Sequence, residues 1–429
     1  MFIENFFQGC RMSYAIDEQA HSDAIRKKIG YKEFVILIGA LMAINSIAVD
    51  IMLPAMPDIL NSLHVFNEND QHFIIFSYLI SYGLTQIFFG PISDRYGRRK
   101  IILIGLALYS FAAIGCAFVS SFSVLLILRI LQGMGGASMR ILTVSVVRDL
   151  YSGRKMAEVM SIVMMIFLIA PMIGPATGQF ILLFVHWQFI FVFMAAIGFG
   201  LMIWIYLRLP ETLHTQRSLS FSSVKYNLWF VITNRTTLCY TLATSIILGC
   251  IFISVNTSQQ TYEGIYNLGL WFPVAFAAGA AFQILSSYLN SHLVGHLGMR
   301  RIAHSMLLLF CVTSGIWFVG SVLTNGVIPF PFYMILFCIL MFTCGGIMAN
   351  FNTLALESVG SVAGTASSVS GFLQTSIGAG ISFFIAQQFN ETTTPNAAGF
   401  FFLSLIAIAL VLWAERGHLF RQYHINPHQ

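Results

Sequence analysis

Twelve long apolar runs, nearly free of charged residues, constrain the fold of this chain more than any other feature. About 20 apolar residues cross the hydrocarbon core of a bilayer. Backbone groups in lipid must be paired within the protein, and runs of this length are twice what a barrel strand needs, so each run is predicted to be a helix. The predicted fold class is an all-α polytopic membrane protein with twelve transmembrane helices. The runs lie near residues 33–53, 72–92, 101–119, 122–145, 157–182, 188–208, 237–256, 269–293, 302–323, 331–354, 362–388 and 397–415.

The composition excludes a water-soluble protein. Of the 429 residues, 57% are apolar and 9% are charged, whereas roughly 25% of the residues in a soluble domain are charged. The mean hydropathy is +0.79. The segments outside the runs are too short to form a sizeable soluble domain, so the function is expected to reside largely within the bilayer.

The basic residues predict the orientation of the chain. Lys and Arg are concentrated in the cytoplasmic segments of membrane proteins. Twenty of the 22 Lys and Arg residues lie in segments that fall on one side of the predicted helices, and the other two lie within a run. The opposite loops contain only acidic charges. Both termini are therefore predicted to be cytoplasmic.

The longest loop between runs divides the chain into two halves of six helices each. Gly97-Arg98-Arg99-Lys100 follows the second run, and a similar Gly298-Met299-Arg300-Arg301 follows the eighth, at an offset of 201 residues. Such spacing is typical of two repeated half-molecules. The predicted divisions are a cytoplasmic tail (1–32), two six-helix bundles (33–208 and 237–415), the cytoplasmic loop between them (209–236) and a C-terminal tail (416–429).

Three charges lie deep within the runs, where each costs a few kcal/mol. Asp50 lies in the first run, and Arg129 and Arg140 lie in the fourth. The two runs cross the membrane in opposite directions, which places Asp50 and Arg129 at similar depth. Two interpretations remain open: a structural ion pair, or a carboxylate that exchanges a proton during transport. Burial disfavours the charged form of Asp50, whereas a neighbouring arginine favours it.

Small and polar residues within the runs offer further candidates. Pro171, Gly174, Pro175 and Gly178 in the fifth run combine missing backbone donors with close helix packing. Polar side chains inside a run serve more often as helix-to-helix hydrogen bonds than as ligand contacts. The candidates for a substrate cavity are Asn45, Tyr78, Tyr82, Gln132, Arg140, Asn256, Asn350 and Gln374.

Motifs for other kinds of chemistry are missing from the sequence. It contains no Walker loop, HExxH or GxSxG motif and no nucleic-acid signature, which leaves ATP-driven pumping and hydrolysis without support. His292 and His296 are four residues apart, but no further metal ligand accompanies them. No enzyme activity, cofactor, metal or nucleic-acid partner is therefore predicted.

Several motifs resemble those of the major facilitator superfamily. The segment Gly90-Pro91-Ile92-Ser93-Asp94-Arg95-Tyr96-Gly97-Arg98-Arg99-Lys100 resembles the signature loop between helices 2 and 3 of that family. The run from Arg129 to Ala137 resembles the helix 4 motif of its proton antiporters, and Pro171 to Gly178 resembles the antiporter motif of helix 5. Asp50-x-x-x-Pro54-x-x-Pro57, Arg148-Asp149, His186-Trp187 and Leu209-Pro210-Glu211-Thr212-Leu213 resemble the bicyclomycin and chloramphenicol-resistance drug/proton antiporters.

This resemblance implies a fold of two bundles around a central cavity that opens alternately to each side. It also implies proton coupling through Asp50 and Arg129. By the same resemblance, Asp94 would lie near the start of helix 11, at about 360–365. Two departures are that Met42 replaces a second acid found in some relatives, and that Gly295 and His296 stand where the repeat would place Asp and Arg. The residues expected to control gating are Gly90, Asp94, Arg95, Gly97, Arg98, Arg99, Pro171, Gly174, Pro175 and Gly178.

The leading functional hypothesis is proton-coupled efflux of small, largely hydrophobic compounds across a bacterial inner membrane. The alternatives are a dedicated exporter of one metabolite, such as a siderophore, a proton-coupled importer, and a non-transporting membrane sensor or enzyme. The fold alone does not choose among solutes. The expected partners are a small-molecule substrate, protons and the lipid bilayer, and the protein is expected to be a monomer.

Overall fold

The computed structural model describes residues 24–215, 221–357 and 363–420. Within these ranges the protein is all-helical and contains no strand. Twelve of its helices are long and apolar enough to cross a membrane, and each coincides with one of the twelve predicted runs. The predicted fold class is therefore confirmed. The predictions for residues 1–23 and 421–429 in the two tails lie outside the described residues.

The membrane-spanning helices of the first half are α2 (Tyr31–Asp50), α4 (Gln71–Tyr96), α5 (Arg98–Ala117), α6 (Phe122–Leu150), α7 (Gly153–Leu182) and α8 (Gln188–Arg208). Those of the second half are α10 (Arg235–Asn256), α11 (Phe272–Leu297), α12 (Met299–Leu323), α13 (Phe330–Glu357), α14 (Ala363–Ala386) and α15 (Thr394–Ala414). The shorter elements are η1 (Leu53–Ala55), α3 (Met56–Ser62), η2 (Glu68–Asp70), α9 (Phe221–Thr233), η3 (Gln260–Ile265) and η4 (Gly269–Trp271).

The first membrane helix is interrupted close to its end. The apolar run continues to residue 53, but α2 ends at Asp50 and is followed by the 3₁₀ turn η1 and the short helix α3. Pro54 and Pro57 lie in the first turns of these two elements. Proline has no backbone donor and is best accommodated in the first turn of a helix, so the two prolines favour the start of new short elements here. Asp50 is thereby placed at a helix end within the membrane-spanning segment.

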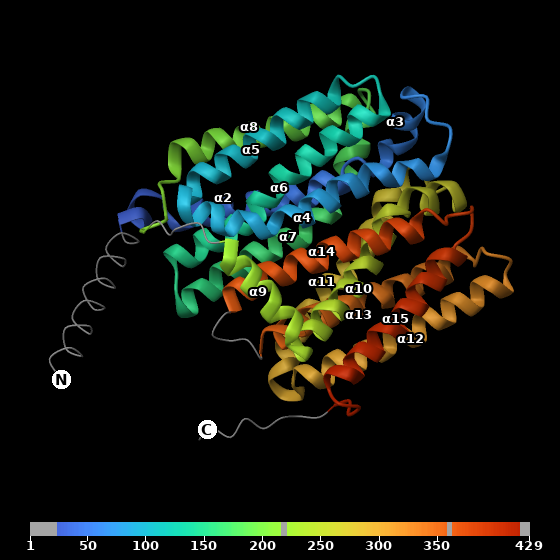
Figure 1. The fold of residues 1–429 in the computed structure, drawn as a ribbon. Coiled ribbons are helices and arrows are strands. Elements are labelled where there is room, and N and C mark those ends of the chain that lie inside the picture. The colour runs from blue at the N-terminus through green and yellow to red at the C-terminus, as the bar shows by residue number, and fades with distance from the viewer. Residues whose placement is uncertain (1–23, 216–220, 358–362, 421–429) are drawn as a thin grey trace.

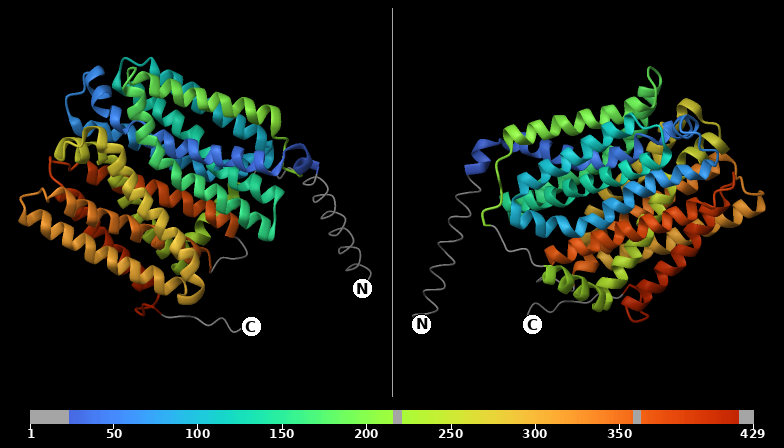
Figure 2. Two further views of the ribbon diagram at one scale, coloured as in Figure 1. Left: turned by 180° about the vertical axis from the view of Figure 1, so that it is seen from behind. Right: turned by 45° about the horizontal axis from the view of Figure 1, so that its top comes forward.

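The twelve helices form two bundles that lie side by side (Figure 1). In the first bundle α6 packs against α4 and α5, and α2 packs against α7; in the second, α10 packs against α13, α14 and α15. Contacts between the bundles run mainly along α4 with α14 and α7 with α11. Figure 2 shows the same division from two further directions.

Hydrogen bonds join the two bundles at one end of the molecule. We call the end at which α4 passes into α5 through Gly97 the basic end, and the end that carries η2 the opposite end. At the opposite end, the Asn69 side chain of η2 donates hydrogen bonds to the carbonyl oxygens of Gln387 and Phe389, at 3.2 and 2.9 Å. The Gln260 side chain in turn donates to Asn69 at 2.9 Å. These bonds join the first bundle to the second and close the opposite end.

The loop between the bundles contains a helix that the sequence analysis did not predict. Residues 209–236 were expected to form a loop, but α9 occupies 221–233 and packs against α14, α10 and α4. Its Val231 is fully buried, in a small apolar cluster with Ile87 of α4 and Val369 of α14. The burial of this apolar side chain against both bundles stabilises a helix in a segment too short to span a membrane.

Candidate functional site

Asp50 is buried at the C-terminal end of α2, with 4% of its side chain exposed. Among the described residues, its carboxyl group forms neither a hydrogen bond nor an ion pair. Gly174 of α7 packs against it so closely that a Cβ atom on Gly174 would lie 2.8 Å from the Asp50 Cβ. The acid therefore faces the helix that carries the two prolines of the fifth run.

Arg129 of α6 is fully buried, and its guanidinium group ties three helices together. It donates hydrogen bonds to Gln132 Oε1 at 2.7 Å, to the carbonyl oxygen of Ala48 at 3.3 Å and to that of Ile74 at 3.4 Å. It also lies over the ring of Tyr78, 4.5 Å from the centroid. These contacts connect α6 with α2 and α4.

Of the two interpretations that the sequence left open, the direct ion pair between Asp50 and Arg129 does not form in the described conformation. The two residues do lie at similar depth, since Arg129 reaches the backbone only two residues before Asp50. However, the guanidinium group donates its hydrogen bonds to two carbonyl oxygens and to the side-chain oxygen of Gln132, and it lies over the Tyr78 ring. None of its described partners is a carboxylate. The common depth follows from the sequence, whereas the competing backbone acceptors depend on how α2, α4 and α6 pack.

The glycines of α7 face α2 and η1, while the two prolines are tolerated within one continuous helix. Gly178 packs against the carbonyl oxygen of Ile51 and against Pro54, just beyond the end of α2. Together with Gly174, it allows α7 to approach the interrupted part of the first membrane helix. Pro171 and Pro175 lie inside α7, which continues from residue 153 to 182. The fifth-run motif thus packs directly on the Asp50 region.

The candidate cavity residues of the first bundle lie close together. Tyr78 donates a hydrogen bond to Asn45 Oδ1 at 3.2 Å and stacks on Tyr82, with 6.0 Å between ring centroids. Gln132 accepts the hydrogen bond from Arg129 described above. Arg140, further along α6, is partly exposed and has no hydrogen bond, ion pair or ring contact with any described residue.

The candidates of the second bundle are dispersed and engage separate partners. Asn256 of α10 donates to Ser382 of α14 at 2.5 Å. Asn350 of α13 donates to Asn290 of α11 at 2.6 Å, and Gln374 of α14 donates to Asn352 of α13 at 2.8 Å. Each of the three therefore acts as a helix-to-helix hydrogen bond, and they do not form one cluster.

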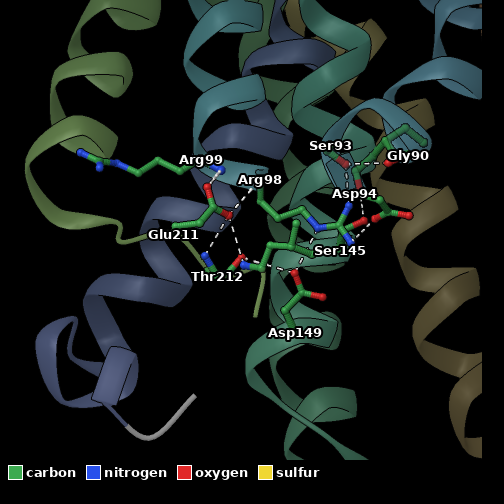
Figure 3. Close-up of polar contacts among 11 residues, drawn as sticks. Gly90, Ser93, Asp94, Arg98, Arg99, Ser145, Asp149, Glu211 and Thr212 are labelled. Atoms are coloured by element: carbon green, nitrogen blue, oxygen red, sulfur yellow. Dashed lines mark hydrogen bonds and ion pairs between the residues drawn. The ribbon is translucent and has the colours of Figure 1, made fainter. Parts of the chain in front are cut away.

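A network of charges holds the basic end of the first bundle (Figure 3). The buried Arg98 guanidinium pairs with Asp94 at 2.6 Å and with Asp149 at 3.1 Å, and it donates a hydrogen bond to Ser93. Glu211, from the segment after α8, accepts hydrogen bonds from the backbone N–H groups of Arg98 at 2.7 Å and Arg99 at 3.2 Å. A carboxylate at this position stabilises the N-terminus of α5.

The other residues of this motif have distinct contacts. Gly97 has a φ of +97°, and a Cβ atom there would collide with the Glu211 carboxylate. The Arg99 guanidinium donates to the Tyr206 carbonyl oxygen and lies 5.3 Å from the centroid of its ring. Arg95 is exposed over the ring of Tyr96, and no described atom would contact a Cβ on Gly90. The prediction that Asp94 lies near residues 360–365 falls on residues outside the described side chains.

The second bundle repeats this arrangement around the predicted Gly298 turn, with two acids that the sequence did not reveal, Glu357 and Glu415. Gly298 has a φ of +81°, and Arg300 pairs with Glu357 at the end of α13 and with Glu415 after α15, each at 2.9 Å. These positions correspond to Asp149 at the end of α6 and Glu211 after α8. The offset of 201 residues was a signal for them, because it carries Arg98 close to Arg300. The polar residue Asn69 was missed as well, since nothing in its sequence context marks it as a contact between bundles.

Metal binding finds no support in the described part of the chain, where no cluster of three or more metal-binding side chains occurs. His292 instead lies beside Tyr288, with 4.7 Å between ring centroids, and its Nδ1 atom lies 3.0 Å from the Tyr288 carbonyl oxygen. The ligands that the pair would need are therefore not present among these residues.

Comparison with known proteins agrees with this architecture. The chain is 29% identical over 372 residues to a bicyclomycin resistance protein homolog of Haemophilus influenzae, an alignment that covers 84% of this chain and 91% of the relative. It is 30% identical over 263 residues to a chloramphenicol resistance protein of Pseudomonas aeruginosa, covering 59% and 60% of the two chains. It is also 30% identical over 384 residues to an uncharacterized transporter, YdgK, of Bacillus subtilis, covering 88% and 94%.

Solved structures share the fold at low sequence identity. A peptide transporter, POT, aligns with a TM-score of 0.73 at 12% identity, covering 92% of this chain and 98% of its own. The xylose transporter XylE of Escherichia coli aligns with a TM-score of 0.65 at 13% identity, covering 89% and 96%. The sequence profile of the Major Facilitator Superfamily matches residues 38–383. The protein is thus a multi-pass membrane transporter, not an enzyme, and it belongs to the Major Facilitator Superfamily.

Proposed function

We propose that this transporter exports small, largely hydrophobic compounds in exchange for protons, by alternating access across a bacterial inner membrane. The names of its relatives, which include bicyclomycin, chloramphenicol and multidrug resistance proteins, support export of this kind of compound. The observation that supports proton coupling is the burial of the Asp50 carboxyl group. This group forms no ion pair with any cation in the described part of the chain, and it lies at a helix end that packs on α7.

An ionised carboxylate in such surroundings is costly, because burial removes most of the water around the charge and no described cation compensates it. We infer that Asp50 holds a proton in the present conformation. Its surroundings depend on how α7 packs against the interrupted end of α2, so movement between these helices changes the cost of ionisation. Asp50 would take up a proton from the outside and release it to the cytoplasm when the cavity changes sides.

The direction of opening follows from the orientation of the chain. If the basic end lies in the cytoplasm, as the distribution of Lys and Arg predicts, then the bonds of Asn69 close the outer side. Alternating access requires these bonds to break when the protein opens outward. Both termini would then be cytoplasmic.

The remaining predictions complete the proposal. The two six-helix bundles, at 33–208 and 237–415, would rock against each other around a substrate that binds between them, and the linker 209–236 would lie in the cytoplasm. The transporter would act as a monomer, and its energy would come from the proton gradient without a cofactor.

Proton coupling can be tested in inverted membrane vesicles with an imposed pH gradient and a panel of fluorescent hydrophobic compounds. Asp50→Asn should reduce gradient-driven accumulation to the level of vesicles without the transporter. Asp58→Asn is the matched control, because Asp58 is an exposed acid only eight residues away. Wild-type accumulation by Asp50→Asn, with the same gradient dependence, would contradict the proposal.

A further inference from the structure

Arg140 lies on the face of α6 that points into the first bundle. Arg129, Gly133, Gly136 and Arg140 follow one another at intervals of three and four residues, so they share one face of the helix. Gly133 packs against Tyr78 and Ser81 of α4, and Gly136 packs against Asn45 of α2 and Tyr78. The lipid-facing side of α6 is marked instead by the exposed residues Val124, Ile127 and Ile130. The Arg140 side chain is therefore directed away from lipid.

The two arginines on this face are in different states. Arg129 is completely buried and its guanidinium is hydrogen-bonded. Arg140 is partly exposed and has no hydrogen bond, ion pair or ring contact among the described residues. The exposed part of Arg140 therefore lies on a side of α6 away from the lipid-facing residues Val124, Ile127 and Ile130. An unpaired guanidinium at this depth is tolerated only where it meets water or a ligand.

The depth of Arg140 is close to the middle of the membrane. It precedes the end of α6 at Leu150 by ten residues, which corresponds to about 15 Å at 1.5 Å per residue. That is about half the thickness of a hydrocarbon core. Membrane transporters commonly bind their substrates near this level.

No acid of the described helices balances the charge of Arg140. Asp50 is close in depth to Arg129, and 11 residues along α6 separate Arg129 from Arg140, or about 16 Å. Six acids at the basic end already pair with other cations: Asp94 and Asp149 with Arg98, Glu357 and Glu415 with Arg300, Glu33 with Arg208, and Glu158 with Lys155. Glu211 accepts hydrogen bonds from the backbone N–H groups of Arg98 and Arg99. Among the described residues, the positive charge of Arg140 is therefore not compensated by an acid.

We propose that Arg140 binds an anionic group of the exported compound, so that the transporter prefers amphipathic compounds that carry a carboxylate or another oxyanion. The guanidinium group presents two parallel N–H donors that match the two oxygens of a carboxylate. A neutral amide side chain in place of Arg140 would lack both the charge and this geometry. This inference rests on the proposed function only in taking a small molecule as the cargo.

The test compares ligands that differ in charge but not in shape. Naphthaleneacetic acid, naphthaleneacetamide and naphthylethylamine form one such triplet, and the same three groups on biphenyl and indole form two more. Binding to the purified full-length transporter is measured by titration calorimetry in detergent, without a proton gradient. A charge-assisted hydrogen bond is worth about 1.5–3 kcal/mol, so the carboxylate should bind about tenfold to hundredfold more tightly than the matching amide.

Variants identify the residue responsible for this preference. Arg140→Gln should remove the difference between carboxylate and amide, whereas Arg140→Lys should retain part of it, because the charge remains but the planar fork is lost. Arg148→Gln is the matched control, because Arg148 is an exposed arginine of the same helix, and it should leave the preference unchanged. Elution as a single species in size-exclusion chromatography establishes that each variant is folded.

Three outcomes overturn the inference: equal or tighter binding of the amides or amines, absence of binding by every carboxylate, or a carboxylate preference that survives Arg140→Gln. The comparison of ligands on the wild-type protein decides the question even if Arg140→Gln does not fold. Wild-type gradient-driven transport by Asp50→Asn, together with an intact carboxylate preference, would instead contradict proton coupling alone, so the two proposals fail separately.

Discussion

Gly174 of α7 lies directly against Asp50 of α2, with room for no side chain between them. A Cβ atom on Gly174 would stand 2.8 Å from the Asp50 Cβ and 3.4 Å from the backbone nitrogen of Ile51. The glycine of the fifth-run motif and the membrane-embedded acid therefore belong to one helix contact. Any relative movement of α7 and α2 must change the surroundings of the carboxyl group.

Replacing Gly174 by leucine should open this contact. The larger side chain forces α7 away from the end of α2, so we expect a proton leak through liposomes that contain the variant. The leak is measured with a pH-sensitive dye after an imposed gradient. Gly200→Leu serves as the control, since Gly200 lies in α8 with no atom within 4 Å of a Cβ position. A gradient held as well as in wild type, together with a lower folded yield, would show that Gly174 serves packing alone.

Asp50→Asn should abolish coupling at little cost in stability. The carboxyl group has no ion pair or hydrogen bond among the described residues, so an amide of similar size breaks no contact. We expect the melting temperature to stay within about 3 °C of wild type, corresponding to a change in the free energy of unfolding of about 1 kcal/mol or less. A large drop in melting temperature would indicate that Asp50 has a structural partner.

Arg129→Ala should lower stability more than any substitution at Asp50. It leaves the carbonyl oxygens of Ala48 and Ile74 and the side chain of Gln132 without their donor. Each buried polar group left unpaired costs about 1–3 kcal/mol. The thermal melting temperature in detergent checks this, and Arg148→Ala is the exposed control on the same helix. Retention of wild-type stability by Arg129→Ala would contradict the role of Arg129 as a tie between α2, α4 and α6.

The pH dependence of transport separates Arg129 from Arg140. We expect Arg129→Ala to move the pH profile upward, because a neighbouring arginine favours the charged form of Asp50, and Arg140→Ala to change mainly expression or substrate range. Arg129 forms no ion pair with Asp50 in this conformation, so any direct effect of Arg129 on Asp50 must occur in another state of the transport cycle. Initial transport rates measured between pH 5.5 and 8.5 provide the check. A pH profile that moves with Arg140→Ala and not with Arg129→Ala would make Arg140 the partner of Asp50.

Asn69→Ala should weaken the closure of the opposite end. The substitution removes the bonds to the carbonyl oxygens of Gln387 and Phe389 and to Gln260. Spin labels at the exposed positions Phe66 and Leu323, in a background without native cysteines, should show a larger population of long distances. Asn61→Ala, at an exposed position of α3, is the control. Unchanged distance distributions in Asn69→Ala would mean that other contacts hold this end closed.

The sequence by itself determined the number of membrane helices and their approximate ends. The requirement is local, because a bilayer of fixed thickness demands about 20 apolar residues and a helical backbone. The deep positions of Asp50, Arg129 and Arg140, and the comparable depth of the first two, follow from helix geometry and run direction. The Gly97 and Gly298 turns were recognisable for the same reason, since their spacing along the chain needs no knowledge of packing.

Only the tertiary structure decided which groups satisfy the buried charges. A guanidinium group can bond to any acceptor within reach, and the carbonyl oxygens of Ala48 and Ile74 come into reach of Arg129 only when α2, α4 and α6 pack together. In the same way, Glu357 and Glu415 meet Arg300 only because the ends of α13 and α15 converge on the start of α12. Sequence distance does not encode these contacts, because they depend on how whole helices pack rather than on the residues next to each charge.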